Sequence, residues 1–576
     1  MKNWTTDAIF YHIYPLGFCG CEQYNQPNTT SRILKLKDWI PHLKEMNINA
    51  LYLGPVFESY EHGYDTSDYQ LIDHRLGTNA DFRCVCDALH EAGIHIVLDG
   101  VFNHVGRNFW AFQDVIKHRE RSKYCSWFYN LNFYGNDPMN DGFTYDTWEG
   151  HYNLVKLNLQ NEEVVQYLLE SVAMWMDDFH VDGLRLDAAD CVDPNFFKRL
   201  KSFCKEKNPD FWLMGEIIHG DYNRWANKDM LDSVTNYECY KGLYSSHNEK
   251  NYFEINYSLN RQFANQGGIY SNLLLYNFVD NHDVNRLAST VKDEKDLKNI
   301  YTMLYAMPGI PSIYYGSEYG IKGVKAHGSD ANLRPCLDLS ELEKENVELY
   351  QHICKLGNAY SQLEALHSGV FQQVVVKNQQ LVFARKTNHQ IVYAVFNVSD
   401  DDAEISFQVE TNCVKDALSN TEYACNNQTF NEVLPAKSSM LLVVEENKEI
   451  PVEPKEEKPV EPDTTTDQEP IDQVVHVSDH KLEETVKLDE VVDVQVEEAM
   501  QLPVVEPKIP YGVYEHFKGK RYAVLYVAKH SEDLTDYVVY RQLYGSGDVW
   551  VRPLSMFQET VEVDGKEVPR FRYIKP

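Results

Sequence analysis

The chain contains no long hydrophobic run and no recognisable export signal. No apolar stretch approaches the roughly 20 residues that a membrane-spanning helix needs. The N-terminal residues MKNWTTDAIFYHIYPLGF carry one lysine, but they have neither an extended apolar segment nor a small-residue cleavage site. We therefore expect no signal peptide, no membrane partner and a cytoplasmic location.

Positive charge is scarce. The 576 residues include 54 Lys and Arg against 87 Asp and Glu, and the formal net charge is -33 at pH 7. Such an excess repels phosphate backbones, so nucleic acid is excluded as a partner and a neutral substrate is favoured. A large part of the acidity lies in residues 447–508, which contain no aromatic residue and have the composition of a disordered, extended linker.

The 12 cysteines lack the spacing of a metal site or a disulfide framework. Two C-x-C pairs occur, but Cys19 and Cys21 have no neighbouring His or Cys, and Cys84 and Cys86 lie in a helical pattern. Disulfides do not persist in a reducing compartment. We expect reduced structural thiols and no bound metal.

Residues 9–316 alternate short apolar runs with helical patterns. A chain of this length is too long for a single core, and the alternation is typical of consecutive βα units with a parallel sheet. Eight runs with helices between them predict an α/β fold, a (β/α)8 TIM barrel. The predicted strands are 9–16, 50–56, 95–102, 181–188, 211–217, 232–237, 273–280 and 312–316.

The rest of the chain predicts further domains. The third and fourth runs are joined by a connection too long for a simple loop, of which residues 161–179 show a helical pattern. Alternating apolar residues with turns between them follow the barrel. We expect the barrel at 1–104 and 161–339, an inserted domain at 105–160, an antiparallel β-sandwich domain at 340–446, the linker at 447–508 and a small β-rich domain at 509–576.

Three acidic residues, Asp187, Glu216 and Asp283, come at the ends of three predicted strands. A βα barrel collects its functional groups at this edge, and neighbouring strands lie about 5 Å apart, so Asp187 and Glu216 are expected side by side. Two such carboxyl groups can cleave a glycosidic bond with retention, one as nucleophile and the other as acid/base. Arg185 shares a strand face with Asp187 and is expected to keep its carboxylate ionised. Taken singly, each acid could equally cap a helix or pair with an arginine.

Several segments together resemble the α-amylase family, glycoside hydrolase family thirteen. They are ALYLGPVF (50–57), DGVFNH (99–104), GLRLDAAD (183–190), GEI (215–217), FVDNHD (278–283) and GIPSIYYGSEYG (309–320). The resemblance covers about residues 5–446 and implies that Asp187 is the nucleophile, Glu216 the acid/base and Asp283 the transition-state stabiliser. It also implies an inserted domain B and a β domain C.

The resemblance further implies a set of substrate-binding residues. Tyr64 resembles the ring that stacks on the sugar at the cleaved bond. LVKLN (154–158), which contains Lys156, resembles a domain B segment of the neopullulanase and cyclomaltodextrinase group, and NLRPCLD (332–338) places Arg334 after the eighth strand. The other residues of this set are Asp99, His104, Arg185 and His282.

The chain departs from these relatives at two places. Many amylases bind calcium through a His four residues after the nucleophile, where this chain has Cys191; Asn103 alone cannot supply the oxygens that calcium needs. We expect no required cofactor and no calcium at that position. The cyclomaltodextrinase group has an N-terminal β domain that this sequence does not show, so its dimer and its cyclodextrin preference are not carried over.

The C-terminal segment resembles a small bacterial domain of unknown function, through HSE (530–532), YRQLYG (540–545) and WVRPL (550–554). Trp550 and Arg552 could bind a glycan or protein ligand, while the interpretation of Trp550 as a core residue is favoured.

The sequence therefore predicts a retaining α-glucan hydrolase that acts on maltooligosaccharides or related short α-glucans. Ala188 after the nucleophile leans towards α-1,4 bonds, with α-1,6 bonds left open. One alternative is a transglycosylase, in which a sugar hydroxyl replaces water. A non-catalytic binding or scaffold relative is disfavoured because all three carboxylates are present.

Overall fold

The computed structural model describes residues 3–26, 28–342, 344–445, 509–529, 535–544, 549–563 and 566–575. The predicted linker at 447–508 lies outside these ranges. The chain divides into two compact units, Met1–Pro454 and Lys455–Pro576, and each has its own hydrophobic core. None of the described helices is long and apolar enough to cross a membrane.

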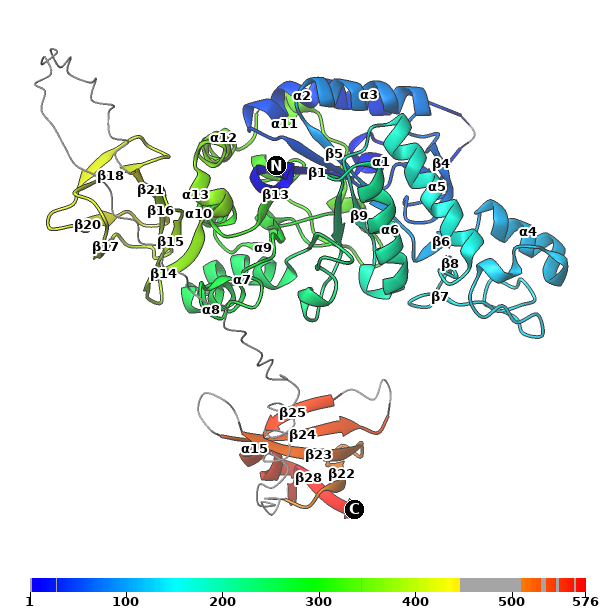
Figure 1. Ribbon diagram of the computed structural model, residues 1–576. Coiled ribbons are helices and arrows are strands. Elements are labelled where there is room, and N and C mark those ends of the chain that lie inside the picture. The colour runs from blue at the N-terminus through cyan, green and yellow to red at the C-terminus, as the bar shows by residue number, and fades with distance from the viewer. Residues whose placement is uncertain are drawn as a thin grey trace, which may run out of the picture. The chain divides into compact units, whose positions relative to one another are not determined.

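The first unit is built on an eight-stranded parallel barrel (Figure 1). Its strands are β1 (Phe10–Ile13), β2 (Ala50–Leu53), β5 (His95–Gly100), β9 (Gly183–Leu186), β10 (Trp212–Gly215), β11 (Ser233–Val234), β12 (Tyr276–Phe278) and β13 (Ile310–Tyr314). The order is β11-β10-β9-β5-β2-β1-β13-β12, and a parallel bridge between Thr235 and Tyr276 closes the ring. The predicted (β/α)8 barrel is confirmed. Seven strands lie inside their predicted runs, and β13 begins at Ile310, two residues before the predicted run at 312–316.

Large side chains fill the barrel interior. Phe10 lies 5.3 Å from Trp212 and 5.4 Å from Tyr276 between ring centroids. These rings and smaller neighbours such as Ala50 form a separate buried cluster. The barrel interior is therefore filled by side chains and supports the groups at the strand ends.

Helices surround the strands because one face of each is apolar. The longer ones are α2 (Leu36–Glu45), α3 (Asn79–Glu91), α5 (Glu162–Asp178), α6 (Pro194–Lys207), α7 (Tyr237–Asn248), α8 (Tyr252–Phe263), α10 (Leu297–Ala306) and α12 (Val347–Gln362). Short helices are α1 (Pro15–Phe18), α9 (Leu287–Thr290), α11 (Leu339–Leu342) and α13 (Glu364–Ser368). α5 matches the predicted helix at 161–179, and the side chain of Asn161 caps it by accepting from the backbone N–H of Glu163 and Val164.

A small excursion follows the third barrel strand. It contains α4 (Trp110–His118) and a three-stranded sheet of β6 (His104–Gly106), β8 (His151–Lys156) and β7 (Thr147–Trp148). These elements lie together at one side of the barrel (Figure 1). A hairpin of β3 (Phe57–Ser59) and β4 (Thr66–Ile72) follows the second barrel strand.

The strands after the barrel are antiparallel, as predicted. One sheet has the order β14-β15-β16-β21-β18-β19, and β17 pairs with β20. Their bounds are β14 (Val370–Val376), β15 (Gln380–Lys386), β16 (Gln390–Asn397), β17 (Ala403–Gln408), β18 (Cys413–Asp416), β19 (Glu422–Ala424), β20 (Thr429–Leu434) and β21 (Ser438–Glu445). Buried Arg385 on β15 fixes this sheet to the barrel by donating to the carbonyl of Ala306, at the end of α10.

The second unit is β-rich, as predicted. Its five-stranded sheet has the order β25-β24-β23-β22-β28, and β26 pairs with β27. The elements are β22 (Gly512–His516), β23 (Arg521–Lys529), β24 (Asp536–Gln542), β25 (Val549–Pro553), α15 (Leu554–Gln558), β26 (Thr560–Val563), β27 (Lys566–Pro569) and β28 (Phe571–Lys575).

Two helix glycines allow a test of how tightly the barrel helices pack. A Cβ at Gly357 on α12 would lie 2.1 Å from the carbonyl oxygen of Met46, whereas a Cβ at Gly242 on α7 would meet the flexible end of Ile255 at 2.9 Å. Alanine normally stabilises a helix relative to glycine by up to about 1 kcal/mol, but a backbone clash cannot relax. We expect Gly357→Ala to lower the free energy of unfolding by about 1–2 kcal/mol, and Gly242→Ala to change it by less than about 1 kcal/mol. Urea unfolding of both variants measures the difference, and equal stability would contradict the close approach.

Candidate active site

A cavity of about 1050 Å³ opens at the carboxyl ends of the barrel strands. Asp187, Glu216 and Asp283 all line it, and Trp148 and Leu154 contribute a wall from the inserted excursion. Its volume is at the upper end of the range for small-molecule sites. The three predicted carboxylates thus share one cavity.

Strand register explains how the first group of residues meets. Asp99 on β5 pairs with Arg185 on β9, and Arg185 pairs with Met214 on β10. Paired residues of neighbouring strands share a face, and side chains two residues further along return to it. Asp187 and Glu216, two residues beyond Arg185 and Met214, therefore point into the same space.

Arg185 connects the carboxylates of this group. Its Nη1 donates to Asp99 Oδ1 and Asp187 Oδ1, both at 2.8 Å, and its Nη2 lies 2.8 Å from Glu216 Oε2. Arg185 is buried, so these interactions are shielded from water. The backbone N–H of Ala188 also donates to Glu216 Oε2, at 3.1 Å.

One guanidinium does not neutralise three carboxylates. Burial raises the pKa of Asp187 well above its usual value; Arg185 lowers it, and the charges of Glu216 and Asp99 raise it further. The sequence predicts that Arg185 keeps Asp187 ionised. In the structure, the desolvation of the Asp187 carboxylate has a larger effect on its pKa than the charge of Arg185 has. Burial therefore disfavours the charged form of Asp187.

Asp283 lies in a second group with different electrostatics. His282 Nε2 is 2.9 Å from one carboxylate oxygen of Asp283, and Arg334 Nη2 donates to the other at 2.9 Å. Burial opposes the charge on Asp283, but His282 and Arg334 outweigh it and lower the pKa of this carboxyl group. The structure thus brings the predicted residues His282 and Arg334 onto the third carboxylate.

Tyr64 joins the two groups. Its hydroxyl lies 3.1 Å from Asp99 Oδ2 and 2.5 Å from His282 Nε2, and its ring is stacked on His282 at a centroid distance of 5.6 Å. Because Tyr64 lines the cavity, it presents the remaining part of its ring to a bound molecule.

His104 faces the first group from the start of β6. Its Nε2 lies 4.0 Å from Asp187 Oδ2 and has no hydrogen-bond partner within the described residues. Burial lowers the pKa of His104 to about 3, so the ring is neutral near pH 7. An unpartnered nitrogen that faces the cavity is free to bind a sugar hydroxyl.

Lys156 is placed beside the cavity. It pairs with His104 across β6 and β8, and its ammonium lies 5.8 Å from the centroid of the Tyr129 ring. Lys156 is not among the residues that line the cavity, so its contact with substrate stays a prediction.

Sequence reasoning missed several residues of the site. The cavity is also lined by Tyr14, Trp148, His151, Tyr237, Tyr240 and Lys325. His12 on β1 was missed as well: it is buried, stacks on Tyr52 at 4.2 Å and meets the edge of His282 at 5.1 Å. Its position at the end of the first strand was an available signal, whereas Trp148 lies in the excursion, where no strand pattern identifies it.

In the second unit, Trp550 on β25 is 52% exposed. The interpretation of Trp550 as a core residue is therefore wrong. Arg552 lies on the same strand, and its Nε is 3.4 Å from the hydroxyl of Tyr540.

A barrel whose carboxyl-end cavity holds paired carboxylates defines the class of this protein: a glycoside hydrolase on a (β/α)8 scaffold. The family described as "alpha amylase, catalytic domain" matches residues 34–360. The chain belongs to the α-amylase family. Residues 512–573 match a family described as "protein of unknown function (DUF1653)".

Individual relatives agree with this assignment. A cyclomaltodextrinase from Bacillus sp is 31% identical over 420 residues, which cover 68% of this chain and 73% of that protein. An intracellular maltogenic amylase from Bacillus subtilis (strain 168) is 30% identical over 417 residues, 69% of each chain. The ligand-free structure of cyclic alpha-maltosyl-(1→6)-maltose hydrolase from Arthrobacter globiformis has a TM-score of 0.66 at 24% identity, covers 77% of this chain and 99% of that chain, and supports the fold alone.

The neutral state of His104 leads to a prediction on pH dependence. Because its pKa is lowered to about 3, His104 does not titrate between pH 4 and pH 8. We expect His104→Gln, which keeps a neutral donor, to lower kcat/KM by about tenfold without moving the acid limb of the profile of kcat/KM against pH. His151→Gln, at the same cavity, is the control. A shift or loss of the acid limb in His104→Gln alone would contradict a neutral His104.

Proposed function

We propose that the chain hydrolyses α-glucans with retention, with Asp187 as nucleophile, Glu216 as acid/base and Asp283 as stabiliser of the transition state. The observation that carries this proposal is that Asp187 and Glu216 contact the two terminal nitrogens of one buried guanidinium, that of Arg185. Retention requires a nucleophile and a proton donor that reach one glycosidic bond.

In the first step, a carboxylate oxygen of Asp187 attacks the anomeric carbon as the bond to the glycosidic oxygen breaks. Glu216 gives its proton to that oxygen, so the leaving chain departs as an alcohol. Asp187 attacks as the anion, and the positive charge of Arg185, which lowers the pKa of this carboxyl group against the effect of burial, supports that form.

In the second step, Glu216 takes a proton from water as the water oxygen attacks the anomeric carbon. The ester bond to Asp187 breaks, and the product leaves with its original configuration. In both steps positive charge develops on the sugar ring. The lowered pKa of Asp283 keeps a negative charge available to stabilise it.

We further propose that the substrates are maltooligosaccharides and related short α-glucans, and that their α-1,4 bonds are cleaved. Cleavage of α-1,6 bonds is kept as an additional alternative. The names cyclomaltodextrinase and intracellular maltogenic amylase of two relatives support this range, and the latter name supports an intracellular location. Tyr64, Asp99, His104, Arg185, His282 and Arg334 would bind the sugar or orient the carboxylates.

Transfer to a sugar hydroxyl is the second candidate activity. Ile218 is 47% exposed and lines the cavity two residues after Glu216. An apolar side chain beside the acid/base disfavours water and favours a sugar as the attacking molecule. Product chromatography at high maltotriose concentration separates the two, since transfer gives products longer than the substrate.

Neutralising the proposed catalytic carboxylates tests their roles. We expect Asp187→Asn to lower kcat on maltotriose by about four orders of magnitude, and Glu216→Gln by about two to four. Asp190→Asn, an acid at the same cavity without a proposed role, is the matched control and should stay within about tenfold of wild type.

The first-formed sugar should be the α-anomer, which proton NMR detects before mutarotation. Near wild-type activity of Asp187→Asn, or a β-anomer as the first product, would refute the retaining mechanism.

We also propose that no calcium is needed at the position where many relatives bind it. The Asn103 side-chain nitrogen lies 3.2 Å from His104 Nδ1, and burial raises the pKa of Cys191 to about 11, so this residue is a neutral thiol at pH 7. A neutral thiol and one amide do not fit a cation that takes about six to eight oxygens.

Chelation gives the test of calcium independence. Dialysis against EDTA should leave both activity and thermal unfolding unchanged, because Cys191 and Asn103 do not supply the oxygen ligands that calcium needs. Loss of either property, restored by added calcium, would show that the proposal is wrong.

A further inference from the structure

Two exposed aromatic rings stand next to the catalytic cavity. Tyr24 is 45% exposed and Tyr60 49% exposed, and their ring centroids lie 5.5 Å apart with an angle of 40° between the planes. Gln23 and Glu61, the chain neighbours of these tyrosines, line the cavity. The two rings, which we call the tyrosine platform, are therefore carried by the same loops as part of the cavity wall.

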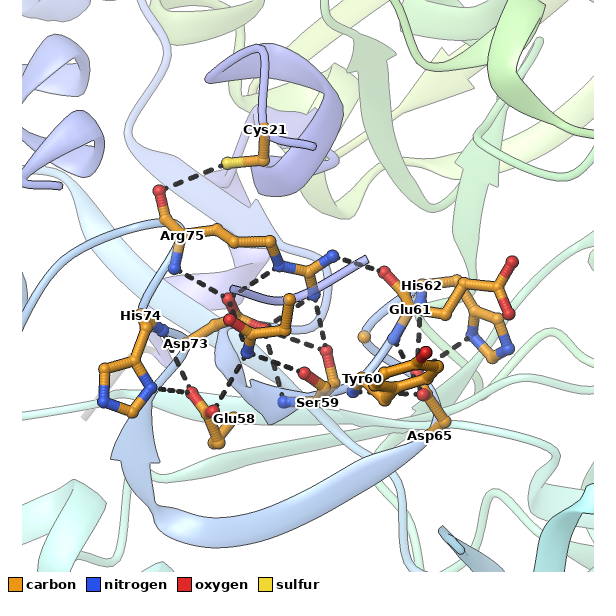
Figure 2. Close-up of polar contacts among 12 residues, drawn as sticks. Cys21, Glu58, Ser59, Tyr60, Glu61, His62, Asp65, Asp73, His74 and Arg75 are labelled. Carbon is orange, nitrogen blue, oxygen red and sulfur yellow. Dashed lines mark hydrogen bonds and ion pairs between the residues drawn. The ribbon is translucent and has the colours of Figure 1, made fainter. Parts of the chain in front are cut away.

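A single buried arginine holds the backbone on both sides of this platform. Arg75 Nη1 donates to the carbonyl oxygens of Glu22 at 3.0 Å, Gln23 at 2.9 Å and Glu61 at 2.7 Å. Its Nε and Nη2 donate to Asp73 at 2.9 Å and 2.8 Å. Figure 2 shows this guanidinium between Asp73 and the loop that carries Tyr60 and Glu61. The two loops are thus fixed to one point, although about 40 residues separate them.

A second buried group fixes the loop under Tyr60. The carboxylate of Asp65 accepts the backbone N–H groups of Tyr60, Glu61 and His62, at 3.1, 2.8 and 3.0 Å (Figure 2). On the other loop, the backbone N–H of Asn25 donates to the carbonyl of Tyr60 at 2.8 Å. The backbone below both rings is therefore hydrogen-bonded before any ligand arrives.

Polar side chains connect the platform to the cavity lining. Gln23 Nε2 donates to Glu61 Oε1 at 2.8 Å and lies 3.4 Å from the hydroxyl of Tyr24. These side chains leave free donor and acceptor positions for sugar hydroxyls. Aromatic faces on a rigid backbone flanked by such groups match a pyranose, which has an apolar face and a hydroxylated edge.

We propose that the tyrosine platform is an outer glucan-binding site, which takes glucosyl units of a chain whose reactive part lies in the cavity. The inference rests on the proposed α-glucan hydrolysis and extends it to chain length. Its occupant is the same substrate chain, because the platform is continuous with the cavity through Gln23 and Glu61. Pre-ordered loops reduce the entropy lost on binding, so the rings add to affinity for long chains.

The test compares substrates of different length in the intact chain. In the double variant Tyr24→Ala/Tyr60→Ala, we expect kcat/KM for maltoheptaose and soluble amylose to fall about tenfold, mainly through KM. The value for maltotriose should change by less than about twofold, since a short chain does not leave the cavity. Tyr24→Phe/Tyr60→Phe should keep wild-type values on all three, because the ring faces suffice. Tyr257→Ala, which removes a 64% exposed tyrosine on α8, is the matched control.

The outcomes separate the platform from the catalytic proposal. Equal losses on maltotriose and maltoheptaose, or no loss on either, would overturn the platform while leaving the roles of Asp187 and Glu216 intact. A loss in the Phe pair as large as in the Ala pair would overturn stacking as its basis. If Asp187→Asn stayed active while the length-dependent loss was observed, the catalytic assignment would fail and the platform would stand.

Discussion

The contact of Arg185 with three carboxylates is the interaction on which the site depends. The guanidinium presents several N–H donors in a rigid plane, and here they reach Asp99, Asp187 and Glu216 at once. The arrangement holds two reactive carboxyl groups in fixed positions while leaving their total charge incompletely balanced. In the proposed mechanism one acid donates a proton and the other attacks as an anion, and full neutralisation of each acid would remove that difference.

The barrel makes that contact possible and keeps Asp283 apart from it. Asp99, Asp187 and Glu216 come from three consecutive strands of the sheet order, while Asp283 follows β12 and takes its partners from His282 and Arg334. The two groups therefore have different charges, with a raised pKa at Asp187 and a lowered pKa at Asp283. Strand position on one scaffold thus separates an acid whose charged form is disfavoured, Asp187, from one whose charged form is favoured, Asp283.

The barrel and its three carboxylates could be predicted because both depend on local rules. Apolar runs set the strands, and alternation along a strand sets which side chains share a face. Three features could not be predicted in this way. The raised pKa of Asp187 depends on burial by the whole fold. The position of Trp148 depends on the pairing of β7 with β8. The position of Arg334 depends on Gly17, because a Cβ at residue 17 would lie 2.1 Å from the carbonyl oxygen of Arg334. Each is set by contacts between distant segments.

The site contains arginines with two kinds of role. Arg185 and Arg334 bind carboxylates that line the cavity, so their charges act on the reacting groups. Arg75 instead forms one ion pair with Asp73, and its other donors reach the Ser59 hydroxyl and backbone carbonyls of two loops. An isolated buried guanidinium would be unfavourable, and Asp73 offsets that desolvation. With Asp73 offsetting its charge, Arg75 fixes the geometry of the two loops. Loops near the cavity can therefore differ in sequence, and so in the ligand that they would contact, while the side chains at the strand ends keep their arrangement.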